Sequence, residues 1–249
     1  MNSYQLIAGS LIVFISFGLK AVTGLGAALV CVPLLSLLID IKTVVPLELI
    51  FEVFFGAVII IKIWGQVKKD ILVIMITSSF VGVMVGSKIL AYASQNSLRI
   101  ILSALIFIFA IKILFPASTR SSIKKTPNIP FGLLCGFAGG SIGGVTGQQG
   151  PPIAIYTENQ IEDRGKLRST LIAIFFINDI LRCGVYTAQG LFTQELLTSA
   201  LYFLPALIAA VICGSTFHLK INEVYFNRIV AGILICSAVF LVIPALKGN

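Results

Sequence analysis

The fold of this chain depends on one stretch, Gly139-Gly140-Ser141-Ile142-Gly143-Gly144-Val145-Thr146-Gly147-Gln148-Gln149-Gly150-Pro151-Pro152. Its glycines and prolines cannot sustain a straight helix, because glycine costs backbone entropy and proline removes a hydrogen-bond donor. Yet it lies inside an apolar run that extends from Phe131 to Tyr156. In lipid, a broken backbone is tolerated only where protein or a water-filled cavity satisfies its polar groups. We therefore interpret this stretch as a helix break at membrane depth, and as the predicted binding site.

The composition excludes an ordinary soluble domain. Hydrophobic residues make up 57% of the 249 residues and charged residues 11%, whereas soluble domains have about a quarter charged residues. Several apolar runs reach the roughly 20 residues that a helix needs to cross a bilayer. We predict an all-α polytopic membrane protein. Because the first residues lack a basic region, we expect no cleaved signal peptide.

The apolar runs predict two broken segments, each followed by three spans. Pro46 is expected in the first turn of its helix, and the Gly82-x-x-x-Gly86 spacing predicts close helix approach. Tyr186 is expected at a span end, as an interfacial aromatic residue. The predicted segments are a run at 6–39 that breaks near 18–26, spans at 46–64, 71–92 and 98–115, a broken run at 131–156, and spans at 170–188, 196–217 and 224–246.

Short matches indicate that the second half repeats the first. They keep their order and occur at offsets of 123, 128 and 129 residues, which favours a duplicated unit. We predict a first repeat at 1–115, a linker at 116–129 and a second repeat at 130–249. The matches are Val22-Thr23-Gly24 with Val145-Thr146-Gly147, Gly86-Ser87 with Gly214-Ser215, and Arg99 with Arg228.

The distribution of basic residues predicts how the broken segments meet the membrane. If each crossed once, the loop Lys and Arg residues would divide eight and eight between the two sides. If each instead returned to its own side as a re-entrant hairpin, twelve of these basic residues would lie on one side of the membrane and four on the other. The four are Lys42, Lys88, Arg99 and Lys247. Only the second arrangement satisfies the positive-inside rule. A re-entrant hairpin does not cross the membrane, so each half crosses it three times, which is an odd number, and the second half begins on the opposite side from the first. We therefore expect two inverted repeats with both termini outside, a recurrent design of secondary transporters.

The tips of the two hairpins are the predicted substrate-binding site. They combine small residues, hydroxyls and side-chain amides, and a half-helix that restarts after each tip should offer unpaired N–H groups and a positive dipole end to an anion. The alternative is that the glycines only permit tight packing. The tip candidates are Thr23, Gly24 and Gly26 in the first half, and Thr146, Gly147, Gln148, Gln149 and Gly150 in the second.

Charged and amide residues inside the spans supply the remaining candidates. Glu48 and Glu52 are four residues apart and share a helix face, as do Asn178 and Arg182, with Asp179 beside them. Such residues usually mark a pathway or a proton relay. In that interpretation Asn178 and Arg182 bind the anion, while Glu48, Glu52 and Asp179 are proton-coupling candidates. The competing interpretation is a structural ion pair, such as Asp179 or Glu52 with Arg182 or Lys20.

Other classes of function find little support in the sequence. The five cysteines lie in apolar segments without metal-site spacing, and there is a single histidine, so we expect no metal, no cofactor and no enzymatic centre. There is no Walker-type sequence for ATP hydrolysis. Because the basic residues lie in short loops, we expect no nucleic-acid partner.

Several motifs resemble the sulfite exporter TauE/SafE family of membrane permeases over nearly the whole chain. They are Gly147-Gln148-Gln149-Gly150-Pro151-Pro152, Arg168-Ser169-Thr170, Gly24-Leu25-Gly26 and the helix containing Asn178. The resemblance implies transport of small anions, such as sulfite, sulfonates or related organic acids, across the bacterial plasma (inner) membrane. The expected partners are that anion, the lipid bilayer and a proton or other coupling ion. An uncoupled anion channel is the alternative, and a homodimer stays open.

Overall fold

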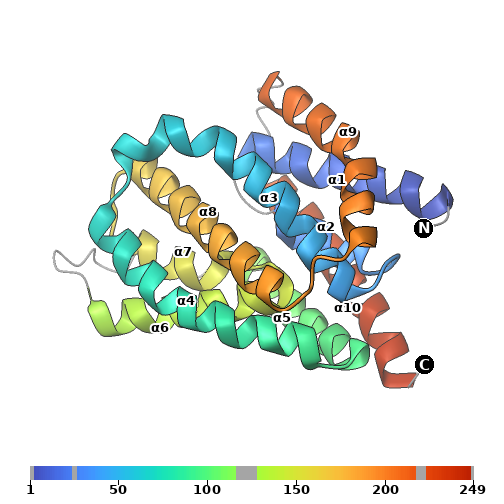
Figure 1. The fold of residues 1–249 in the computed structure, drawn as a ribbon. Coiled ribbons are helices and arrows are strands. Elements are labelled where there is room, and N and C mark those ends of the chain that lie inside the picture. The colour runs from blue at the N-terminus through green and yellow to red at the C-terminus, as the bar shows by residue number, and fades with distance from the viewer. Residues whose placement is uncertain (1–2, 24–26, 116–127, 217–222, 248–249) are drawn as a thin grey trace. The chain divides into compact units, whose positions relative to one another are not determined.

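The structure, a computed structural model, describes residues 3–23, 27–115, 128–216 and 223–247. Side chains are described for residues 4–20, 27–115, 128–213 and 228–245. These residues form helices and connecting turns, without strands (Figure 1). The all-α prediction is therefore confirmed. In order, the elements are α1 (Ser3–Thr23), α2 (Ala27–Leu35), α3 (Ile41–Ile63), η1 (Trp64–Gln66), α4 (Lys69–Tyr92), α5 (Gln95–Leu114), α6 (Ile129–Thr146), α7 (Gly150–Glu158), α8 (Arg164–Ala188), α9 (Gln194–Thr216) and α10 (Glu223–Lys247).

The chain packs as two compact units, each built from separate stretches of sequence. Unit 1 comprises Met1–Glu48, Ala93–Ala117 and Phe192–Asn249, and unit 2 comprises Leu49–Tyr92 and Ser118–Leu191. Contacts define these units, so they do not test the division into sequence repeats, which stays a prediction. Among the described residues, seven helices are long and apolar enough to cross a membrane: α3, α4, α5, α6, α8, α9 and α10.

Unit 2 is organised around the glycine-rich helix α6, which runs along α4 (Figure 1). One face of α6 carries Gly136, Gly140 and Gly144, four residues apart. A Cβ on Gly140 would overlap the backbone carbonyl of Ser79 in α4, and one on Gly144 would lie 2.9 Å from the amide nitrogen of Ser87. Gly82 and Gly86 of α4 approach the α6 backbone in the same way. The close approach predicted from the Gly82 spacing is confirmed.

A second face of α6 packs against α7, which folds back along it. A Cβ on Gly143 would lie 2.9 Å from Cβ of Gln149, and one on Gly139 would lie 2.6 Å from Ile153. Moving from the tip toward the start of α6 thus corresponds to moving from the tip toward the end of α7. Because α7 has nine residues, it spans only about 14 Å and cannot cross a bilayer alone. The second broken segment is a helical hairpin.

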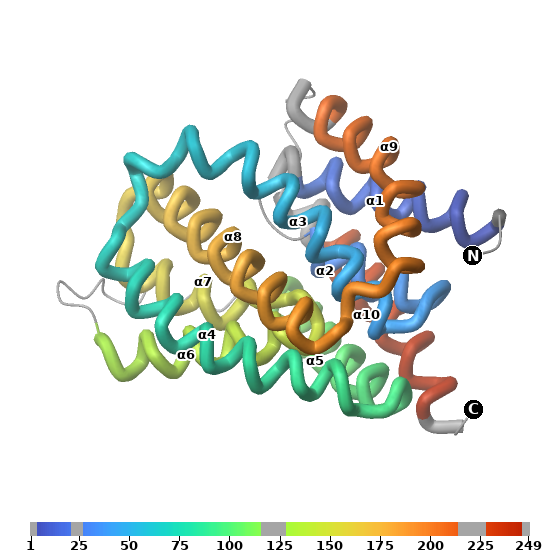
Figure 2. The backbone as a smooth tube through the Cα atoms, in the orientation of Figure 1, coloured from blue at the N-terminus to red at the C-terminus, as the bar shows by residue number. Residues whose placement is uncertain are grey.

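Unit 1 contains a similar hairpin, formed by α1 and α2. The Gln5 amide Nε2 donates to the Leu38 carbonyl at 2.9 Å, just beyond α2, and a Cβ on Gly9 would lie 3.5 Å from Leu35. The start of α1 therefore meets the end of α2. Against this hairpin packs α9, whose Phe203 ring would lie 2.7 Å from a Cβ on Gly9; α10 packs along α5 (Figure 2).

The two hairpins make equivalent contacts. Gly9 meets Phe203 of α9 in unit 1, and Gly132 meets Ile74 of α4 in unit 2. Gly132 follows Gly9 by 123 residues, and Phe203 follows Ile74 by 129, the same offsets at which the sequence matches occur. This correspondence is what a duplicated unit predicts. Opposite orientation of the repeats in the membrane stays a prediction.

Two local predictions are wrong. Pro46 does not begin its helix, because α3 starts at Ile41 and holds Pro46 inside. The first break does not begin at Gly18, since α1 continues to Thr23. In both cases the packing of a long apolar helix outweighs the cost of placing a proline or a glycine inside it. Around Pro46, for example, Val44, Val45 and Leu47 are fully buried.

We predict that Gly140→Ala destabilises the protein by about 1–3 kcal/mol, because the new methyl group overlaps backbone that cannot move aside. Thermal unfolding of the purified protein in detergent measures this. The matched control is Gly184→Ala on α8, where nothing lies within 4 Å of the added atom. Equal melting temperatures for the two variants would contradict the tight α4–α6 contact.

Candidate functional site

The candidate site begins at the tip of the α6–α7 hairpin, where the backbone turns sharply. Gly147 ends α6 in the left-handed conformation, with φ of 81°, and its amide donates to the Gly143 carbonyl at 2.8 Å. Thr146 donates its hydroxyl to the Ile142 carbonyl at 2.9 Å, and the same oxygen accepts from the Gln148 amide at 3.4 Å. Glycine is needed at position 147 because this conformation is costly for other residues.

The α7 end of the tip has fewer backbone donors than expected. The second and third residues of α7 are Pro151 and Pro152, which have no N–H group, and the Gln149 amide donates to the Gly147 carbonyl at 3.2 Å. This tip can therefore offer fewer unpaired N–H groups to an anion than the sequence analysis expected. The positive dipole end of α7 remains, but hydrogen bonds to a ligand have to come mainly from side chains.

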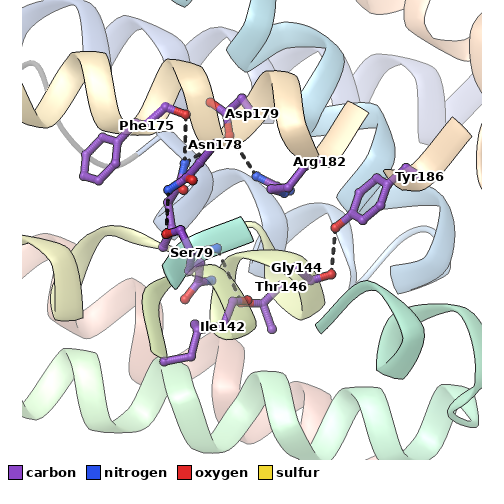
Figure 3. A network of polar contacts seen from close by, with 11 residues as sticks. Ser79, Ile142, Gly144, Thr146, Phe175, Asn178, Asp179, Arg182 and Tyr186 are labelled. Atoms are coloured by element: carbon purple, nitrogen blue, oxygen red, sulfur yellow. Dashed lines mark hydrogen bonds and ion pairs between the residues drawn. The ribbon is translucent and has the colours of Figure 1, made fainter. Parts of the chain in front are cut away.

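Side chains of α8 extend toward this tip and form a buried polar network (Figure 3). The Gln149 Nε2 donates to Oδ1 of Asp179 at 3.0 Å and to the Phe175 carbonyl at 3.3 Å. Arg182 donates to the same Asp179 oxygen at 3.0 Å, which forms an ion pair with side chains 0% and 4% exposed. The structure thus confirms an Asp179–Arg182 ion pair, one of the pairings expected under the structural interpretation.

A second branch of the network joins α8 to α4 and α6. The Asn178 Nδ2 donates to the Ser79 hydroxyl at 3.1 Å, and Ser79 donates to the Gly136 carbonyl at 3.0 Å. Both side chains are fully buried. Ser79 was not among the predicted site residues. Its only sequence signal is its position one turn before Gly82 on the glycine-bearing face of α4.

Tyr186 is the other site residue that sequence reasoning missed. It lies in the last turn of α8, at a span end as expected, and it is fully buried. Its hydroxyl donates to the Gly144 carbonyl at 2.7 Å, and the Arg182 guanidinium carbon lies 5.5 Å from its ring centroid (Figure 3). The spacing of four residues from Arg182 places it on the same face of α8, which was the available signal.

The structure brings together part of the predicted residue set. Gln149, Asn178, Asp179 and Arg182 share the network, and Thr146, Gly147, Gln148 and Gly150 form the tip beside it. Glu48 and Glu52 are buried one turn apart on α3, and their part in proton coupling stays a prediction. Thr23 is the last residue of α1, its side chain lies outside those described, and Gly24 and Gly26 lie outside the described residues.

The Arg168-Ser169-Thr170 motif connects α8 to the turn before α4. The Thr170 hydroxyl accepts from the Lys68 amide at 3.0 Å, and the Ser169 hydroxyl lies 3.3 Å from Oε1 of Gln66. The described contacts of this motif are therefore structural. None of the five cysteines, all among the described residues, forms a disulfide, and the described residues contain no group of His, Cys, Asp and Glu that could hold a metal ion.

These features define a multi-pass helical membrane protein with interrupted helices and a buried polar site at one interruption. The family described as "Sulfite exporter TauE/SafE" matches residues 9–241, and the chain belongs to this family of membrane transporters. It is 23% identical over 169 residues to a "Probable sulfite/organosulfonate exporter TauE" from Cupriavidus necator. That match covers 67% of this chain and 65% of the relative. No solved structure matches the chain.

We predict that Arg182→Met lowers the free energy of unfolding by about 3–5 kcal/mol, because it leaves the buried Asp179 without its cationic partner. The double variant Arg182→Met, Asp179→Leu should be more stable than Arg182→Met alone, since it removes the uncompensated charge. The free energies of unfolding of the wild type, the two single variants and the double variant together form a double-mutant cycle. Additive effects would show that the pair is not coupled.

Proposed function

We propose that this protein is a secondary transporter that exports a small sulfur oxyanion, sulfite or an organosulfonate, or a related organic acid across the bacterial plasma membrane. Family membership and the printed name of the Cupriavidus necator relative support this substrate class. The observation that carries the proposal is the buried network of Gln149, Asp179 and Arg182 at the hairpin tip. Charged side chains inside a membrane protein are expensive and usually belong to a substrate or ion pathway.

The tip residues have complementary roles in holding an anion. Arg182 balances part of its charge, and the positive end of α7 adds a favourable dipole near Gly150. The Gln148 amide supplies hydrogen-bonding groups that are buried beside the tip, at 3% exposure. Gly147 and Gly150 lack side chains, so a ligand can approach the backbone closely. We also propose Thr23, Gly24 and Gly26 of the first half as substrate-binding residues, with transport by alternating access.

Charge balance favours a coupled proton. The buried charged side chains described in unit 2 are Arg182, Asp179 and Glu52, one base and two acids. An incoming anion adds a further negative charge to this low-dielectric region, where like charges repel more strongly than in water. A proton taken up by a carboxyl group offsets that charge. We assign this role to Asp179, which lies in the network, with Glu48 and Glu52 as further candidates on α3.

We predict that Thr146→Val slows anion uptake by purified protein in liposomes by about tenfold or more, because it removes the hydroxyl that orients the tip while keeping the side-chain shape. The control is Thr77→Val on α4. The exposed Thr77 hydroxyl makes the same type of bond, to the Val73 carbonyl at 2.9 Å, away from the site. Equal rates for wild type and Thr146→Val would refute the proposed site.

For the Asp179→Asn variant in liposomes, we expect that a pH gradient no longer accelerates net anion flux. Exchange of labelled for unlabelled anion should continue. The amide keeps the shape of the carboxyl group but cannot take up the proton. Acceleration equal to that of wild type would remove Asp179 from coupling. Conductive flux without saturable counterflow in the wild-type protein would favour the anion channel.

A further inference from the structure

We propose that the site selects an oxyanion that has a single negative charge and also carries an O–H or N–H donor. Hydrogen sulfite and hydroxy-substituted sulfonates have this chemistry, whereas sulfate and the sulfite dianion offer only acceptors and two charges. This inference rests on the proposed function and specifies the substrate of the same site. It follows from the direction of the hydrogen bonds and from the charge of the buried residues.

The Ser79 hydroxyl determines which atom of Asn178 is free. Ser79 has one hydrogen, and it donates that hydrogen to the Gly136 carbonyl at 3.0 Å. Toward Asn178 it can therefore only accept, so the Asn178 atom 3.1 Å away is the NH2 group. The amide oxygen Oδ1 then points elsewhere. It is buried and has no hydrogen-bond donor among the residues that the structure describes.

The same reasoning fixes the orientation of Gln149. Its contacting atom faces two acceptors, the Asp179 carboxylate oxygen at 3.0 Å and the Phe175 carbonyl at 3.3 Å. An amide oxygen would be repelled in this position, so the atom is the NH2 group. Oε1 is buried and has no donor within the described part of the chain. The network therefore leaves two amide oxygens, both acceptors, in need of a donor.

A ligand that consists only of acceptors cannot satisfy these oxygens. A buried polar atom without a partner keeps the full cost of its desolvation, which is why sites built for a hydroxyl or amine reject analogues that lack it. The Gln148 amide, at 3% exposure, has neither atom bonded among the described residues and offers both a donor and an acceptor at the tip. A mixed donor and acceptor ligand matches this set of groups.

The charge of the site excludes a dianion on separate grounds. Of the described side chains, Arg182 is the one basic group that is fully buried, and it is already paired with Asp179 at 3.0 Å. The Arg182–Asp179 pair is neutral as a whole, so it holds no spare positive charge. One negative charge can be offset by Arg182 together with a proton on a carboxyl group. A second would stay uncompensated in a low-dielectric environment.

The test measures binding to the purified full-length protein in detergent by calorimetry, with counterflow in liposomes as a second readout. Methanesulfonate and sulfate have similar size and differ in charge. Likewise, 2-hydroxyethanesulfonate and propane-1-sulfonate have similar size and differ in a hydroxyl donor. We expect methanesulfonate to bind at least about tenfold more tightly than sulfate, and the hydroxylated sulfonate about tenfold more tightly than propane-1-sulfonate, as for one buried hydrogen bond.

One substitution tests whether Asn178 causes the preference for a ligand that carries a hydrogen-bond donor. Asn178→Leu removes the amide oxygen at similar size, and we expect the preference for the hydroxylated sulfonate to fall at least several-fold, while methanesulfonate is still preferred over sulfate. The control is Gln189→Leu on the same helix. Gln189 also donates an amide N–H to a serine, Ser87 at 3.0 Å, and its Oε1 is likewise buried without a donor among the described residues. No described hydrogen bond joins Gln189 to Gln149, Asn178 or Asp179. Its substitution should leave both preferences unchanged.

Each outcome separates this inference from the proposed function. Sulfate bound as tightly as methanesulfonate would overturn the charge selection, and equal affinity for the two larger sulfonates would overturn the donor selection, with anion transport intact in both cases. If no member of the panel binds or exchanges, the proposed function itself fails, and this inference with it. The comparisons on the wild-type protein stand even if Asn178→Leu does not fold.

Discussion

The close approach of α6 to its two neighbours is the constraint on which unit 2 depends. One glycine face of α6 lies against the backbone of α4, and the other lies against α7. On the α4 face a Cβ would overlap backbone atoms, and on the α7 face it would lie 2.9 Å from the Gln149 side chain or 2.6 Å from the Ile153 side chain, so glycine is what allows this spacing. The approach brings the Ser79 hydroxyl to a backbone carbonyl of α6 and holds the hairpin tip where α8 can reach it. The polar site is therefore a consequence of helix packing.

Hydrogen bonds with α8 hold both arms of the hairpin in place. Tyr186 donates to the last turn of α6, and Gln149, at the start of α7, donates to Asp179 and to the α8 backbone. Each bond satisfies a buried polar group whose isolation would cost about 1–3 kcal/mol. The same bonds fix the direction in which the amides of Asn178 and Gln149 face. The contacts that stabilise the fold thus also set what the site can bind.

On the predicted division into repeats, the two halves differ in the chemistry of the site. At the offset of 123 residues, Asn178 and Arg182 correspond to Phe55 and Ile59, and Gln149 corresponds to Gly26. Gly56 corresponds to Asp179, and a Cβ at that position would lie 2.5 Å from the Phe176 ring. Apolar packing at these positions of α3 replaces the network on α8. The polar groups of the site are concentrated in the second half.

The fold class, the two broken segments, and the charged and amide residues within apolar helices could all be predicted from the amino-acid sequence. Residues such as Asn178 and Arg182 could be assigned to one helix face because helical periodicity is a local property. Three features became clear from the folded structure alone: Ser79 and Tyr186 join these residues, α1 continues past Gly18, and Asp179 pairs with Arg182 and Gln149. These outcomes depend on contacts between residues that lie on different helices or compete for one partner. Helix packing sets those distances, and no local pattern in the chain records them.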